Sequence, residues 1–275
     1  MKLKEAFFLL GLRPRPRVYG SAIREFGLRV DGPVRYAQWL HPNESLKRIA
    51  QEDVDELRTF LRPGDVAVDI GAHTGDSTLP IALAVGKSGC VLALEPNRYV
   101  FPVLERNAAL NPAVTNILPL MIAATPKDGE FQFEYSDAGF CNGGSHQGIS
   151  PWRHGSAFKL MVQGRNLEAL LRTGYPELIG RLRYVKVDAE GFDHAVLASL
   201  AALLDQRRPY LKAEIFKRTT RQEREAFLAF LRRHGYRVHH VESEHRYRGE
   251  LVTVAKVMRW PHYDVFCVPD GGGDM

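Results

Sequence analysis

VAVDIGAHTGDS (66–77) is a short apolar run that passes directly into two glycines and then into a helical pattern. An apolar run with few polar interruptions is typical of a strand that helices cover on both faces of a sheet. Gly71 and Gly75 allow the chain to turn sharply and its backbone to approach a ligand closely. The segment therefore predicts a strand, a ligand-binding turn and a helix, in that order.

The same alternation of strand and helix continues along the chain. Further strand-like runs occupy residues 90–96, 116–123, 184–190 and 210–216. Helical patterns occupy residues 76–85, 99–110, 166–171, 194–204 and 222–234. Parallel neighbours need a crossover connection, which a helix provides, so the pattern predicts an α/β fold with a doubly wound, mainly parallel sheet. Its binding crevice is expected at the carboxyl ends of the strands.

Segments outside this alternation predict two additions to the sheet. Residues 130–136 alternate apolar and polar side chains, as a half-buried strand does, and lead into a loop at 137–151 that is rich in Gly, Asn and Ser. Residues 236–243 and 263–269 predict an antiparallel C-terminal strand pair. No tract of repeats interrupts the pattern.

The turn signal Arg62-Pro63-Gly64 divides the chain into two parts. Residues 1–61 are predicted to form an N-terminal extension of helix and strand, with contacts to a substrate or to a second copy in a homo-oligomer. Residues 62–275 are predicted to form the ligand-binding domain. The apolar run at 6–12 is much shorter than the ~20 residues of a membrane-spanning helix, so no integral membrane association is expected.

Composition places the chain among ordinary globular proteins. Of its 275 residues, 45% are hydrophobic and 25% are charged, which is enough to build a substantial core. The net charge of +5 comes largely from local arginine clusters and is more typical of solvated surface than of a nucleic-acid footprint. Cys90, Cys141 and Cys267 are few and widely separated, which indicates buried thiols in a reducing, cytoplasmic compartment.

Two acidic residues flank the glycine turn and predict a nucleoside cofactor. Asp69 ends the first strand, and Glu95 ends the second, where a carboxylate can accept both hydroxyls of a ribose. The turn has the spacing G-x-x-x-G instead of the G-x-G-x-x-G of a pyrophosphate-binding turn. S-adenosylmethionine has no phosphate and carries a charged amino acid end, whose ammonium group Asp69 would suit. The sequence therefore favours S-adenosylmethionine over a dinucleotide.

Three segments resemble the FkbM family of S-adenosylmethionine-dependent methyltransferases. They are PGDVAVDIGAHTGDSTL (63–79), LALEPN (92–97) and YVKVDAEGFDHAVL (184–197), of which the last carries the most distinctive motif. With LKAEIF (211–216) and DVFCVP (264–269), the resemblance covers roughly residues 45–270. It implies a class I methyltransferase (Rossmann-like) fold and O-methylation of a hydroxyl on a sugar, polyketide or related metabolite of natural-product biosynthesis.

The resemblance also assigns cofactor-binding positions in this sequence. His73 departs from the family pattern, since members commonly carry Asn there, and Asn107 matches the pattern near the second strand. The positions expected to bind S-adenosylmethionine are Asp69, Gly71, Ala72, Gly75, Glu95, Pro96, Asn97 and Ala123.

Transfer of a methyl group to an alcohol requires an acceptor oxygen held in line with the sulfonium and a group that receives its proton. Asp188, Glu190 and His73 are the expected catalytic residues. Asp188 is favoured as the base or orienting group because it ends an apolar strand within the distinguishing motif. Alternatively, Asp188 and Glu190 could cap the helix that begins near His194.

Carboxylates could also bind a divalent metal at Asp188, Glu190 and Glu214, but no metal is favoured, because these acids can equally face lysines. The 137–151 loop carries hydrogen-bonding groups and either contacts the acceptor or is a plain surface connection. Residues expected to contact a small-molecule or glycan acceptor are Asn142, Ser145, His146 and Glu214.

Three other functions compete with metabolite methylation. An NAD(P)-dependent oxidoreductase is disfavoured by the missing glycine spacing. A nucleic-acid methyltransferase is suggested by charge alone, and the fourth strand ends in VDAEG where such enzymes carry an N/D-P-P-Y-type segment. A binding module without turnover is disfavoured because Asp69, Glu95 and Asp188 are all present.

Overall fold

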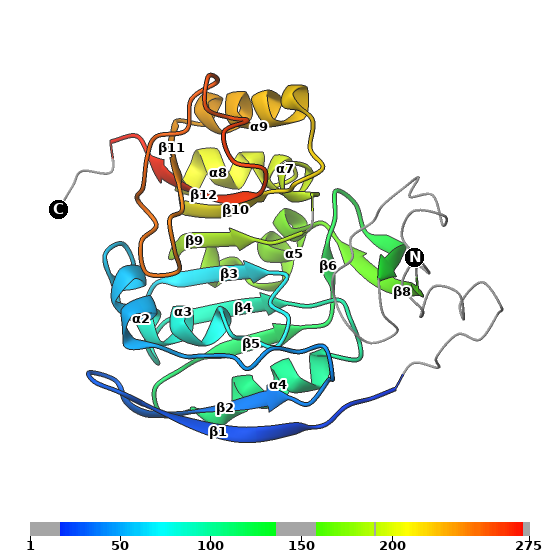
Figure 1. Cartoon of the computed structure of the whole chain (residues 1–275), viewed down its shortest axis with the longest axis vertical. Helices are drawn as coiled ribbons and strands as arrows, with labels where there is room; N and C mark the ends of the chain where they lie inside the picture. The colour runs from blue at the N-terminus through cyan, green and yellow to red at the C-terminus, as the bar shows by residue number, and fades with distance from the viewer. Residues whose placement is uncertain (1–16, 136–157, 190, 272–275) are drawn as a thin grey trace.

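A computed structural model describes residues 17–135, 158–189 and 191–271 (Figure 1). The central sheet has seven strands in the order β11-β12-β10-β9-β3-β4-β5. In chain order they are β3 (Val66–Ile70), β4 (Cys90–Leu94), β5 (Ile117–Leu120), β9 (Leu182–Val187), β10 (Tyr210–Ile215), β11 (Tyr236–His240) and β12 (Tyr263–Pro269). β5, β4, β3, β9 and β10 pair in parallel, whereas β12 lies antiparallel to both β10 and β11. The predicted α/β fold with an antiparallel C-terminal strand pair is confirmed.

Helices cover both faces of this sheet. They are α2 (Gln51–Arg58), α3 (Thr78–Val85), α4 (Phe101–Leu110), α5 (Leu167–Gly174), α6 (Pro176–Ile179), α7 (Asp193–Ala198), α8 (Ala201–Arg207) and α9 (Arg221–Arg233). Side chains of α2 and α3 pack with Ala67 of β3, while those of α5, α7, α8 and α9 pack with Val66 and Val68. Because successive strand side chains point to opposite faces, β3 contributes to both layers of the core. The helix predicted at 194–204 is divided into α7 and α8.

The N-terminal part of the chain adds a hairpin to the domain. β1 (Ser21–Leu28) and β2 (Gly32–Trp39) pair antiparallel, and Figure 1 shows them beside α4. Leu28, Val34 and Tyr36 are buried in the same cluster as α2 and α3. The described residues before 62 therefore share a core with the sheet.

A second, three-stranded sheet lies beside the carboxyl ends of the main strands (Figure 1). It consists of β6 (Ala123–Ala124), β7 (Gly129–Tyr135) and β8 (Phe158–Arg165) in the order β6-β8-β7. The strand predicted at 130–136 is thus part of this small sheet and pairs with β8, which the sequence did not predict. Asn142, Ser145, His146, Glu190 and Cys141 lie outside the described residues.

Cys90 and Cys267 are buried free thiols. Among the helices in the described parts of the chain, none has both the length and the apolar character that a bilayer crossing requires.

Candidate functional site

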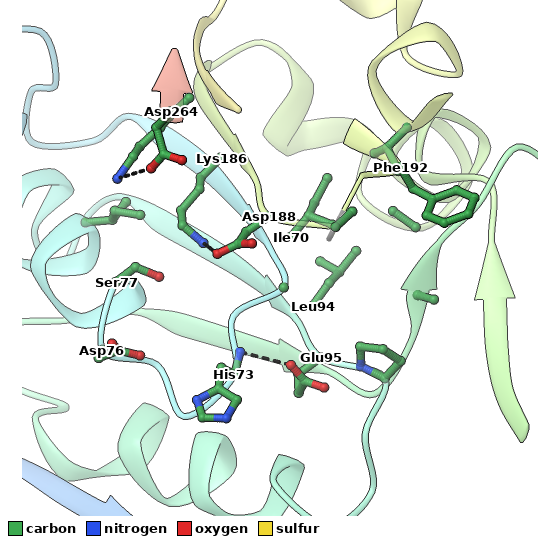
Figure 2. Close-up of a pocket in the computed structure, with 18 of the residues that line it drawn as sticks. Ile70, His73, Asp76, Ser77, Leu94, Glu95, Lys186, Asp188, Phe192 and Asp264 are labelled. Carbon is green, nitrogen blue, oxygen red and sulfur yellow. Dashed lines mark hydrogen bonds and ion pairs between the residues drawn. The ribbon is translucent and has the colours of Figure 1, made fainter. Parts of the chain in front are cut away.

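A cavity of about 570 Å³ opens at the carboxyl ends of the parallel strands, where the sequence predicted the binding crevice (Figure 2). Its volume is in the range of small-molecule sites. The first loop after β3, the end of β4 and the end of β9 all contribute to its wall. Predicted site residues that line the cavity are Gly71, His73, Glu95, Pro96, Ala123 and Asp188.

Gly71 lies where the loops after β3 and β9 touch. Its φ is +76°, and a Cβ added there would stand 2.2 Å from the carbonyl oxygen of Asp188. The Asp188 N–H donates a hydrogen bond to the Ile70 carbonyl at 3.0 Å, which holds the two loops together. A glycine is therefore required here because the backbone of Asp188 leaves no space for a Cβ, whether or not a ligand is bound.

Glu95 ties the first loop to the end of β4. Its carboxylate is buried, and Oε2 accepts a hydrogen bond from the His73 N–H at 3.0 Å while Oε1 accepts one from the Asn97 N–H at 2.7 Å. Each carboxylate oxygen can accept more than one hydrogen bond. Figure 2 shows Glu95 beside His73, facing into the space below Leu94.

Asp69 is fully buried and does not line the cavity. Its Oδ2 accepts hydrogen bonds from Ser77 Oγ at 2.8 Å and Thr78 Oγ1 at 2.7 Å, and its Oδ1 lies 3.2 Å from Lys186 Nζ. The prediction that Asp69 meets the ammonium group of a cofactor is not supported by this geometry. Asp69 instead joins β3 to the start of α3 and to β9.

Lys186 connects this buried acid to Asp188. Lys186 Nζ lies 3.6 Å from Asp188 Oδ2, and Figure 2 shows the two side chains pointing toward each other. Burial alone lowers the pKa of Lys186, but the carboxylates of Asp69 and Asp188 outweigh burial and raise that pKa above its ordinary value. The Asp188 side chain is 48% exposed, so its surroundings are less apolar than its strand suggested.

His73 faces the cavity from the first loop, with φ at +49°. Its ring packs edge-on against Trp39 at 5.6 Å between centroids. Burial is the main cause that lowers the pKa of His73 to about 4, so the imidazole is neutral near pH 7. A base with such a low pKa takes up a proton weakly, so His73 is poorly suited to receive the proton of an acceptor hydroxyl.

Two acidic residues near the end of β10, Glu214 and Asp193, make contacts within the protein. Glu214 does not line the cavity, and its Oε1 lies 3.1 Å from His262 Nε2, so its predicted contact with an acceptor is not supported. Asp193 is buried and accepts hydrogen bonds from the Glu214 N–H at 3.0 Å and the Ala189 N–H at 3.4 Å. Burial raises the pKa of Asp193 to about 7.

Asp188 does not cap the helix that follows it. α7 begins at Asp193 after the N-cap residue Phe192, and no side-chain cap hydrogen bond is present there. Within the described residues, no three His, Cys, Asp or Glu side chains come together in a group that could hold a metal ion.

Of the remaining predicted residues, Ala72, Gly75 and Asn97 lie next to the cavity but do not line it. Asn97 uses its Oδ1 to accept a hydrogen bond from the Tyr99 N–H. Asn107 accepts a hydrogen bond from the Ala37 N–H at 2.6 Å and donates one to the Thr74 carbonyl at 2.7 Å. These two asparagines fix backbone around the site.

Several lining residues were not among the site residues that the sequence predicted. They lie before α2, just after β5, within β7 and around β10 and β12, and no local spacing marks them as a group. The main ones are Asn43, Glu44, Lys47, Ile122, Phe131, Phe133, Lys212, Glu244, Tyr247 and Asp264.

Comparisons with known proteins give one family. The family model described as "Methyltransferase FkbM domain" matches residues 69–238. A search of curated proteins found no match.

Among solved structures, the methyltransferase FkbM from Methylobacillus flagellatus KT aligns with a TM-score of 0.45 and 14% identity, over 78% of this chain and 51% of its own. The chain thus spans about half the length of that protein. An S-adenosylmethionine-dependent O-methyltransferase from Thermotoga maritima aligns with a TM-score of 0.45 and 13% identity, over 91% and 78% of the two chains. Fibrillarin from Aeropyrum pernix, with natively bound S-adenosyl-L-methionine, aligns with a TM-score of 0.44 and 13% identity, over 93% and 97%.

Proposed function

Because the chain belongs to the FkbM methyltransferase family, we propose that it is an S-adenosylmethionine-dependent O-methyltransferase. Its acceptor would be a hydroxyl of a small molecule or glycan, such as a sugar, a polyketide or a related metabolite. The observation that carries the proposal is the cavity at the ends of β3, β4 and β9, which Gly71, Glu95 and Asp188 all line. Membership of a methyltransferase family removes the oxidoreductase alternative. The buried thiols Cys90 and Cys267 are the basis for proposing a reducing, cytoplasmic location.

The cavity suits S-adenosylmethionine at its nucleoside end. Glu95 presents a buried carboxylate at the cavity, and each of its oxygens can accept more than one hydrogen bond, so two ribose hydroxyls would donate to it. Pro96, Ile122 and Phe131 line the cavity with apolar surface, against which an adenine ring would pack. When bound, the cofactor supplies a methyl group made electrophilic by the sulfonium. Every other task in the reaction falls to the side chains of this protein.

Asp188 is the group proposed to orient the acceptor hydroxyl and receive its proton. Its half-exposed carboxylate lines the cavity, so an acceptor can reach it. Lys186, anchored by Asp69, holds one carboxylate oxygen in place and leaves the other for the hydroxyl. A fixed carboxylate removes part of the entropic cost of aligning the acceptor oxygen.

Asp188→Asn is expected to lower turnover by ~10²–10⁴-fold, because the amide cannot receive the proton. Affinity for S-adenosylhomocysteine should change less than about twofold. The measurement is methyl transfer from labelled S-adenosylmethionine to a panel of sugars, glycolipids, polyketide alcohols, RNA and DNA, with calorimetry for ligand binding. Transfer to RNA or DNA alone would overturn the proposed acceptor class, and full activity of Asp188→Asn would remove the proposed role of Asp188.

Glu95→Gln should show the opposite pattern and serves as the matched control. The amide keeps one acceptor oxygen for the loop but loses the charge that strengthens hydrogen bonds to ribose hydroxyls, so affinity for S-adenosylhomocysteine should fall roughly 10–100-fold, or ~1.5–3 kcal/mol. Turnover at saturating S-adenosylmethionine should change far less. Glu95→Ala should weaken binding at least as much and also lower thermal stability, because the His73 and Asn97 amides lose their acceptor. Unchanged affinity in both variants would mean that the ribose is held elsewhere.

A further inference from the structure

The placement of Asp69 leaves one part of the proposed cofactor without a partner. S-adenosylmethionine ends in an amino acid with both an ammonium and a carboxylate, and a binding site for this end needs charges of both signs. Asp69 has both carboxylate oxygens engaged behind the cavity wall. Lys186 is held between Asp69 and Asp188. Other charged residues that line the cavity are therefore candidates for recognising the amino acid end.

A compact group of three charged residues lines the same cavity. It consists of Glu44, Lys47 and Asp76. Lys47 Nζ lies 2.9 Å from Asp76 Oδ2 and 3.3 Å from Glu44 Oε1. Figure 2 shows Asp76 and Glu95 on opposite sides of His73, so this group lies across the first loop from the proposed ribose position.

Burial makes these charges effective. The Glu44 side chain is 2% exposed and that of Lys47 is 22% exposed. Burial by itself would raise the pKa of Asp76, but the charge of Lys47 outweighs burial and lowers that pKa. Burial by itself would lower the pKa of Lys47, but Asp76 and Glu44 raise it. Asp76 and Lys47 are therefore charged near pH 7, and screening by solvent is reduced in the cavity.

The N-terminal hairpin fixes the position of Lys47. The Lys47 N–H donates a hydrogen bond to Gln38 Oε1 at 2.8 Å, and Arg24 donates one to the Lys47 carbonyl at 2.7 Å. Gln38 Nε2 also donates to the Ser45 carbonyl at 3.1 Å. Both strands of the hairpin thus hold this segment against the cavity, so the charged group is in place before a ligand arrives.

We propose that Lys47, Asp76 and Glu44 form the subsite for the amino acid end of S-adenosylmethionine, with Lys47 binding the carboxylate and the two acids binding the ammonium. The assignment rests on the proposed function. Burial raises the pKa of Glu44, against the lowering effect of Lys47. With both carboxylates ionised, the group carries a net charge of −1, which complements the net +1 of a sulfonium amino acid. The same arrangement gives the residues before α2 a part in cofactor binding, whereas the sequence predicted contacts to a substrate or to a second copy for residues 1–61.

Calorimetry with three ligands distinguishes the contribution of the ammonium group to binding from that of the carboxylate. They are S-adenosylhomocysteine, its decarboxylated analogue, which keeps the amine, and 5′-methylthioadenosine, which has neither group. In the unmodified protein, S-adenosylhomocysteine should bind at least about tenfold more tightly than either analogue, since hydrogen bonds to charged groups contribute most. Equal affinity for S-adenosylhomocysteine and 5′-methylthioadenosine would overturn the subsite without any variant.

Lys47→Met should weaken the binding of S-adenosylhomocysteine roughly 10–100-fold and change the affinity for the two analogues by less than about twofold. Asp76→Asn should weaken the binding of both amine-bearing ligands and leave the affinity for 5′-methylthioadenosine unchanged. Arg29→Met is the control, because Arg29 carries the same charge, is 78% exposed and does not line the cavity; it should change nothing. If Lys47→Met weakened the binding of all three ligands equally, Lys47 would have only a structural role. Failure of the unmodified protein to bind any of them would instead count against the proposed function.

Discussion

Gly71→Ala is expected to destabilise the protein by about 4 kcal/mol or more, or to prevent folding altogether. The new Cβ would stand 2.2 Å from the Asp188 carbonyl oxygen, which is backbone and cannot swing aside. The φ of +76° adds a separate cost of ~1–2 kcal/mol for any residue with a Cβ. A loss of this size in a chain of this length would lower the melting temperature by very roughly 10 °C, as measured by calorimetry or circular dichroism.

Gly27→Ala provides the control for this substitution. Gly27 lies in β1 without a positive φ, and nothing stands within 4 Å of an added Cβ. Its substitution should change stability by less than about 1 kcal/mol. If Gly71→Ala melted like the unmodified protein and still bound S-adenosylhomocysteine, the loops after β3 and β9 would have to lie farther apart than described here.

Lys186→Met is expected to cost ~3–5 kcal/mol, because it leaves the buried Asp69 carboxylate without its cation. The raised pKa of Lys186 sets the pH range of this effect. Stabilisation by a group whose pKa is raised on folding is complete below its unfolded value, about 10.4 for lysine, and is lost only as the pH rises through the folded value. The difference in urea stability between the two proteins should therefore be the same at pH 6 and pH 9.

The double variant Asp69→Asn/Lys186→Met tests whether the loss of stability comes from the unpaired charge of Asp69. Removing both charges should recover part of the lost stability, because no unpaired ion is then buried. Lys159→Met, which removes an exposed lysine of β8, should have little effect. Suppose that the double variant is less stable than Lys186→Met by the whole free energy of unfolding that Asp69→Asn costs on its own. The two residues would then not interact.

Local patterns in the sequence were enough to place the strands of the main sheet, the crossover helices and the strand ends at Asp69, Glu95 and Asp188. Strand and helix periods show which side chains a segment buries, and the glycine turn shows where a strand must stop. The chain order of these elements predicted the parallel sheet, its antiparallel end and the crevice. Residues 136–157 and Glu190 lie outside the described residues, so the predictions for Asn142, Ser145, His146 and Glu190 stay predictions.

The sequence by itself thus determined which residues stand at the edge of the sheet, and the tertiary structure alone decided which partners they meet. Asp69 faces Lys186 because β3 and β9 are neighbours in register, although they are distant in sequence. Lys47 reaches the cavity because Gln38 of β2 holds it there. The physical reason is that burial and turns leave a local periodic signature, whereas an ion pair between distant segments depends on strand order and on the route of the chain, which no local pattern encodes.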